Sequence, residues 1–159
     1  MTAGTDGDRR AEVAATTTRD LECPPSAVFD VLRDGWLYAV WVVGAGRIRD
    51  VEPGWPAVGT KIHHSVGSWP ALIDDTTSVL EMEPDRLLKL RGRAWPAGEA
   101  EITITLSPTA DGCRVAITED AVKGPGTLIP PAVRHALLHW RNTETLRRLD
   151  YVATGRARG

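Results

Sequence analysis

The sequence predicts an α+β domain in which an antiparallel sheet packs against one long C-terminal helix. Three observations support this fold class. Short β-prone segments and turns that contain Gly or Pro follow one another at regular spacing between residues 47 and 122. Polar and apolar residues alternate in 101–106, and residues 131–152 carry apolar positions at helical spacing. A length of 159 residues suits one domain with one core.

The N-terminal elements are expected to be one strand followed by two helices. Residues 12–22 form a Thr-rich, β-prone run that ends at Pro24 and Pro25. A helix should begin at Pro25, because proline is favoured in the first helical turn, and end at Gly35. Its apolar stripe consists of Val28, Phe29 and Leu32. A second, short helix is expected over residues 36–41.

Six further strands are expected to form an antiparallel meander, because only short turns separate them. Their ranges are 47–52, 60–66, 76–83, 86–94, 98–107 and 113–122. The clearest alternation places Ile102, Ile104 and Leu106 on one face, opposite polar residues. One face of the sheet should therefore be buried and the other should contact solvent. With the first strand included, the sheet would contain about seven strands.

The last helix is expected over residues 131–152. Twenty residues of helix extend roughly 30 Å, which is enough to cross the whole domain. The folded domain would cover residues 12–153. Residues 1–11 are polar and rich in Gly and Asp, so we expect a disordered leader there and a flexible tail over 154–159.

The composition argues against several classes of function. A net charge of −2, with 19 basic and 21 acidic residues, does not favour binding to nucleic acid or to an anionic membrane. The N-terminus lacks the apolar core of a signal peptide, and no apolar run is long enough for integral membrane association. We therefore expect a cytoplasmic protein. Cys23 and Cys113 lack CxxC spacing, which favours buried free thiols and leaves a long-range disulfide open.

Four motifs occur in the order found in a known superfamily. They are residues 23–32 (CPPSAVFDVL), 51–56 (VEPGWP, leading to Gly59 and Thr60), 81–88 (EMEPDRLL) and 141–149 (RNTETLRRL). On these motifs, residues 12–153 resemble the START-related SRPBCC superfamily of polyketide cyclases/dehydrases and lipid-transport proteins. The resemblance implies a helix-grip fold, a bent sheet around the last helix in the order β-α-α-β6-α. It also implies an internal ligand pocket where sheet and helix diverge.

Helical geometry predicts which side of the last helix faces this pocket. At about 100° per residue, the inward stripe consists of Leu138, Asn142, Leu146, Leu149 and Ala153. His135 and His139 fall on the same side, whereas Arg134 and Arg141 fall outside it. Because buried polar groups need hydrogen-bond partners, Asn142 is expected either to bind a ligand oxygen or to bond to a strand backbone.

Strand alternation supplies further inward side chains. His64 shares a face with Ile62, and Glu119 shares a face with Ile117. The resemblance implies that the short helical segment closes the pocket mouth, and Trp69 in a loop could overhang it. The expected ligand-binding residues are Trp36, Tyr38, Trp41, Ile62, His64, Trp69, Ile102, Ile104, Ile117, Glu119, His135, Leu138, His139 and Asn142.

Three hypotheses of function follow from an apolar wall with few polar groups. The first is binding of a small hydrophobic molecule, such as a lipid, a polyketide or an aromatic metabolite. The second is a polyketide cyclase or aromatase in which His64 or Glu119 is the catalytic acid or base. The third is a co-chaperone-like or regulatory protein that uses its outer surface. Alternatively, His64 makes an orienting hydrogen bond and Glu119 pairs with an arginine such as Arg91.

We expect no metal and no cofactor. His135 and His139, spaced i, i+4, would with His64 offer three nitrogens to zinc, but the chain has no HExxH motif and the resembled family does not usually need a metal. A homodimer is a further possibility, because aromatic residues and arginine share the outward face of the last helix. The residues of that face are Trp140, Glu144, Arg147 and Tyr151.

Overall fold

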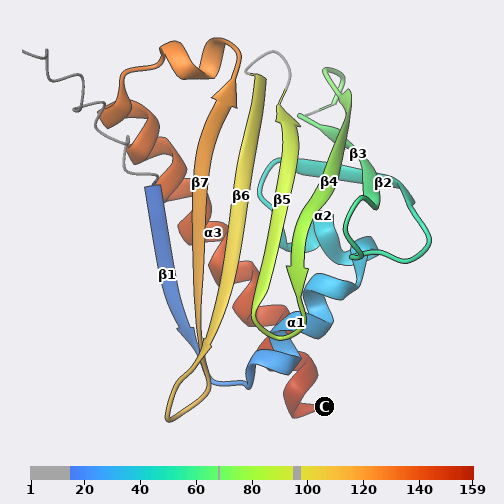
Figure 1. Cartoon of the computed structure of the whole chain (residues 1–159), viewed down its shortest axis with the longest axis vertical. Coiled ribbons are helices and arrows are strands. Elements are labelled where there is room, and N and C mark those ends of the chain that lie inside the picture. Colours follow the sequence, from blue (N-terminus) through green and yellow to red (C-terminus); the bar gives the residue numbers. More distant parts are fainter. Residues whose placement is uncertain (1–14, 68, 95–97) are drawn as a thin grey trace, which may run out of the picture.

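The computed structural model describes residues 15–67, 69–94 and 98–159 (Figure 1). The expected leader, 1–11, lies outside them. The strands are β1 Ala15–Leu21, β2 Ala45–Val51, β3 Lys61–Val66, β4 Ile73–Glu83, β5 Leu87–Ala94, β6 Gly98–Pro108 and β7 Cys113–Lys123. The helices are α1 Pro25–Arg33, η1 Gly35–Leu37, α2 Tyr38–Trp41, η2 Pro125–Leu128 and α3 Pro131–Arg158. Every expected element has a counterpart.

The seven strands form one antiparallel sheet in the order β1-β7-β6-β5-β4-β3-β2. Strands β2 to β7 are sequential neighbours, and β1 joins the far edge by pairing with β7, where Thr17 lies opposite Ile117. Figure 1 shows α3 running diagonally across one face of the sheet, and α1 and α2 pack against α3. The predicted α+β, helix-grip arrangement is therefore confirmed.

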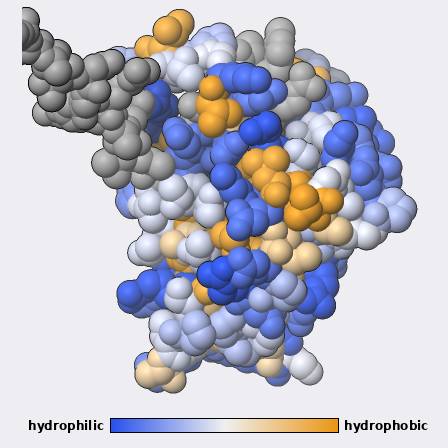
Figure 2. Space-filling view, viewed as in Figure 1, coloured by the Kyte–Doolittle hydropathy of each residue, from blue (hydrophilic) through white to orange (hydrophobic). Residues whose placement is uncertain are grey.

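The core lies between the helices and the inner face of the sheet. Phe29 of α1, Ile104 of β6 and Leu149 of α3 are almost completely buried, and burial of each such side chain contributes about 1.5–3 kcal/mol. The outer face, seen in Figure 2, is dominated by hydrophilic residues. This contrast between faces matches the alternation along β6, where Ile104 is buried and Thr105 is half-buried.

Helix α3 buries the stripe that its sequence predicts. The buried residues of that stripe are Asn142, Leu146, Leu149 and Ala153. Pro131 occupies the first turn, where the missing backbone N–H costs no hydrogen bond. The stripe holds α3 against α1 and the sheet along most of its length.

The end of α3 was predicted too early. The helix continues to Arg158, so most of the expected flexible tail, 154–159, is helical. Arg156 lies 3.4 Å from Asp34, and Arg158 lies 3.1 Å from Glu22. These last residues are mostly exposed, so the sequence showed no alternation of polar and apolar residues that would predict a helix there. In the structure, the two ion pairs join the last turns of α3 to the segments that flank α1.

Two expectations from composition can be compared with the structure. Cys23 and Cys113 are both buried and free, as their spacing predicted. Within the part of the chain that the structure describes, no helix is long and apolar enough to cross a membrane.

Candidate ligand-binding site

A hollow of about 170 Å³ opens between the first turns of α3, η2 and the adjoining ends of β6 and β7. We call it the outer hollow. Its apolar wall consists of Ala100, Ile129, Leu137 and Leu138. Gly98 lines one side with φ +106°, and a Cβ there would lie 1.7 Å from the carbonyl oxygen of Lys123. Glycine at this position therefore lets the start of β6 approach β7 closely.

A second space, of about 30 Å³, lies deeper, between α2, α3 and the middle of the sheet. We call it the inner cavity. Its hydrocarbon wall consists of Val42, Leu90, Ile102, Ile104 and Ile117. Its polar side chains come from Tyr38, Trp41, Glu119, Arg141, Asn142 and Thr145. A volume of this size corresponds to roughly one water molecule.

Glu119 and Arg141 line both spaces, and their side chains form an ion pair. The Arg141 guanidinium donates to Oε2 of Glu119, whose side chain is only 5% exposed. Arg141 was expected outside the inward stripe, and that expectation is wrong because its long side chain bends back toward the sheet. The alternative partner, Arg91, instead donates to Glu101 at 2.6 Å. The pair thus forms the shared wall of the outer hollow and the inner cavity.

Arg134 is a second arginine that was expected outside the stripe and is buried. Its Nη1 lies 3.4 Å from the carbonyl oxygens of both Gly126 and Ile129. It therefore ties the η2 loop to the first turn of α3, where both elements line the outer hollow. Helical-wheel angles place a Cα atom, and they do not determine where a long side chain ends.

His64 lies in a buried polar cluster beside the inner cavity. Its Nε2 is 2.9 Å from Oγ1 of Thr77, and the hydroxyl of Tyr38 is 3.3 Å from the same oxygen. Burial, aided by the nearby charge of Arg49, lowers the pKa of His64 to about 4. The imidazole is therefore neutral at pH 7, and it borders neither of the two spaces described above.

The structure brings about half of the expected ligand-binding residues together. Those that line the inner cavity are Tyr38, Trp41, Ile102, Ile104, Ile117, Glu119 and Asn142. Leu138 lines the outer hollow. Ile62 is fully buried in the core but borders neither space. The residues that sequence reasoning missed include Arg141, Thr145, Ala100 and Leu137. Of these four, Arg141 and Thr145 carried a signal, because they belong to the motif at 141–149.

Four other expected residues lie away from both spaces. Trp36 is 59% exposed and Trp69 is 85% exposed. His135 is half-buried, and His139 is exposed, with its Nδ1 3.2 Å from Oγ1 of Thr17 on β1. Among the described residues, no group of three or more His, Cys, Asp or Glu side chains could hold a metal ion. The three histidines considered for zinc are thus not brought together.

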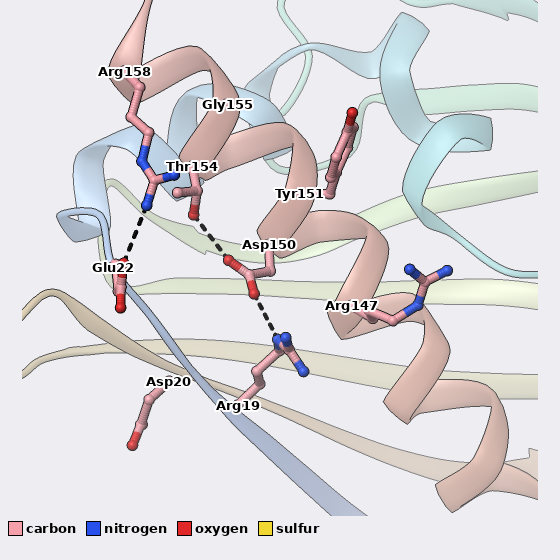
Figure 3. Close-up of a pocket in the computed structure, with 9 residues that line it drawn as sticks. All are labelled: Arg19, Asp20, Glu22, Arg147, Asp150, Tyr151, Thr154, Gly155 and Arg158. Atoms are coloured by element: carbon pink, nitrogen blue, oxygen red, sulfur yellow. Dashed lines mark hydrogen bonds and ion pairs between the residues drawn. The ribbon is translucent and has the colours of Figure 1, made fainter.

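A wider surface groove, of about 680 Å³, lies between β1 and the C-terminal half of α3 (Figure 3). Arg19 donates to Asp150 at 2.8 Å, and Thr154 donates to the same carboxylate at 2.8 Å. The exposed faces of this groove are charged, and its arginines are already paired with carboxylates. The pairs Arg19–Asp150 and Arg158–Glu22 join α3 to β1 and to the residue that follows it, whereas Arg147 pairs with Glu144 within α3. The paired charges leave the groove less suited to an apolar ligand than the outer hollow and the inner cavity.

The comparisons with known proteins concern the family and the fold. A family model described as polyketide cyclase/dehydrase and lipid transport matches residues 12–152. No curated protein matches the chain. The matched range includes every residue that lines the outer hollow and the inner cavity.

Solved structures show the same fold at low sequence identity. A Nitrosomonas europaea protein is 18% identical, with a TM-score of 0.71 over 92% of this chain and 97% of its own. A Staphylococcus aureus protein of unknown function is 9% identical, with a TM-score of 0.73 over 92% and 96%. The di-domain ARO/CYC StfQ from the steffimycin biosynthetic pathway is 12% identical, with a TM-score of 0.71 over 94% of this chain and 54% of its own. At these identities the likeness concerns the fold alone.

Proposed function

The chain belongs to the polyketide cyclase/dehydrase and lipid transport family, and from that premise we propose that it binds a small, largely apolar molecule between α3 and the sheet. The observation that carries the proposal is the pair of adjacent spaces with apolar walls and a few polar groups. Ligand sites are concave, mostly apolar and equipped with a few placed polar groups. The outer hollow would hold the apolar body of the ligand, and the inner cavity would receive the few atoms at the end of the ligand that enters first.

The size of the two spaces limits the ligand. About 170 Å³ in the outer hollow and about 30 Å³ in the inner cavity fall below the roughly 300–1,000 Å³ of pockets for drug-sized molecules. A one- or two-ring molecule is therefore favoured. A longer ligand requires the half-exposed side chain of Arg141 to rotate toward solvent.

Binding is better supported than proton-transfer catalysis. A general acid or base must reach its substrate within hydrogen-bond distance, and His64 borders neither space while its Nε2 is engaged by Thr77. Glu119 borders both spaces, but its carboxylate is engaged by Arg141. The likeness to StfQ adds no weight to the cyclase hypothesis at 12% identity. We therefore propose a carrier or binding protein.

The test is a pair of matched substitutions to tryptophan. Leu138→Trp adds bulk inside the outer hollow, whereas Leu128→Trp adds the same side chain at an 84% exposed position outside its wall. Calorimetric titration with 2-acetylnaphthalene is expected to show at least a tenfold weaker Kd for Leu138→Trp and an unchanged Kd for Leu128→Trp. No binding to the wild-type protein across naphthalene, fatty-acid and polyketide probes, or equal effects of both substitutions, would refute the proposal.

A further inference from the structure

Two buried donors of the inner cavity make no hydrogen bond with any other described residue. They are Nε1 of Trp41 and Nδ2 of Asn142, and both side chains belong to residues that are 2% exposed. Trp41 comes from α2 and Asn142 from α3, and both line the inner cavity. Buried donors are nearly always paired, so two unpaired donors in one small cavity require an explanation.

Three of the polar oxygens in the same wall already have a partner. Oε2 of Glu119 accepts from Arg141, and Oγ1 of Thr145 accepts from the backbone N–H of Val43 at 3.2 Å. The hydroxyl of Tyr38 lies 3.3 Å from Oγ1 of Thr77. The hydrocarbon part of the wall consists of Val42, Leu90, Ile102, Ile104 and Ile117, so the inner cavity offers two unpaired donors beside a mainly apolar surface.

Donor chemistry defines what can complete such a cavity. An indole N–H is donor only, and an amide NH₂ group supplies two hydrogens. A carbonyl oxygen accepts through two lone pairs and brings no hydrogen of its own. An alcohol brings a hydroxyl hydrogen that needs an acceptor of its own, and a methyl or methylene group would leave both donors unpaired.

We propose that Trp41 and Asn142 determine specificity for a ligand whose leading end is a carbonyl oxygen, which the inner cavity receives while the apolar body occupies the outer hollow. This inference rests on the proposed binding function and names the class of ligand that the same site takes. The inner cavity, about 30 Å³, has room for the oxygen and not for a ring. A site built to hydrogen-bond one group discriminates strongly against an analogue that lacks it.

The test uses three probes with one carbon skeleton. 2-Acetylnaphthalene carries a ketone, 1-(2-naphthyl)ethanol carries a hydroxyl at the same carbon, and 2-ethylnaphthalene carries neither. Titration of the wild-type protein is expected to show at least tenfold tighter binding of the ketone than of either analogue. Because all three probes are titrated into the wild-type protein, the result does not depend on whether any variant folds.

Two variants then assign the preference to its donors. Asn142→Leu and Trp41→Phe each remove one donor and keep an apolar side chain of related shape, and each is expected to reduce the ketone preference to threefold or less. Binding of 2-ethylnaphthalene should persist, which also shows that the variant is folded. As controls, Trp140→Phe and Thr143→Val alter exposed positions on α3, the helix that carries Asn142, and should retain the full ketone preference.

The outcomes separate this inference from the function on which it rests. Equal binding of all three probes overturns carbonyl recognition and leaves the binding function in place. A ketone preference that survives in both Asn142→Leu and Trp41→Phe overturns the assignment to these residues. Absence of binding by every probe overturns the proposed function and the inference together. A preference lost in the two cavity variants alone supports the proposal.

Discussion

The guanidinium of Arg141 on α3 donates to the carboxylate of Glu119 on β7, and this ion pair forms a wall common to the outer hollow and the inner cavity. The carboxylate is buried, whereas the arginine side chain is 35% exposed. A charge placed in this way depends on the arginine that it pairs with, because water cannot replace that partner at the buried end. The pair is therefore important both for stability and for access to the inner cavity.

Replacement of Arg141 by methionine should lower the free energy of unfolding by about 1–3 kcal/mol, because Glu119 would remain buried without its partner. The double variant Arg141→Met/Glu119→Leu should recover most of this loss, since neither charge remains. Urea denaturation of the two variants measures the difference. Arg148→Met is the control, because Arg148 pairs with Glu144 at the exposed side of α3 and should cost less than about 1 kcal/mol. A double variant as unstable as the single one would contradict the coupling.

The pH dependence of stability should report on His64. Burial lowers its pKa from 6.5 to about 4 in the folded protein, so the unfolded chain takes up the proton first as the pH falls. This contribution to stability is complete above pH 6.5, declines as the pH falls and is lost near pH 4, for a total of about 3 kcal/mol. Urea unfolding between pH 4 and 8 should show a steeper decline for the wild type than for His64→Gln. Parallel pH profiles for the two proteins would exclude a depressed pKa.

The groove in Figure 3 should contribute to stability without taking part in ligand binding. Arg19 is partly exposed, and its pair with Asp150 joins β1 to α3. Exposed ion pairs contribute little, so Arg19→Ala should lower the free energy of unfolding by at most about 1 kcal/mol. Titration with 2-acetylnaphthalene should give the wild-type Kd. A tenfold weaker Kd in Arg19→Ala would instead place the ligand site in this groove.

Both cysteines should resist modification in the folded protein. Burial raises the pKa values of the Cys23 and Cys113 thiols, and the thiolate is the reactive form. Ellman's reagent should therefore react slowly with the native protein and react with both thiols after unfolding in urea. Rapid reaction of either thiol without denaturant would show that its segment opens readily.

Local patterns of side chains were sufficient to predict the elements and their order. The alternation around Ile104 identified a half-buried strand, and the spacing of Leu146 and Leu149 identified the inward stripe of the last helix. These patterns work because the periods of strand and helix determine which Cβ atoms share a face. The motif at 141–149 also contained Arg141 and Asn142, although helical angles alone placed the arginine on the wrong side.

The sequence by itself thus determined the fold class, the burial of Asn142 and the apolar character of the cavity wall. Only the tertiary structure decided that Arg141 pairs with Glu119, that His64 turns to Thr77 beside the cavity, and that Trp69 is exposed. The physical reason is that periodicity reports the direction of a Cβ atom over a few residues. The end of a long side chain, and the partner it meets, depend on packing between segments that are distant in the sequence.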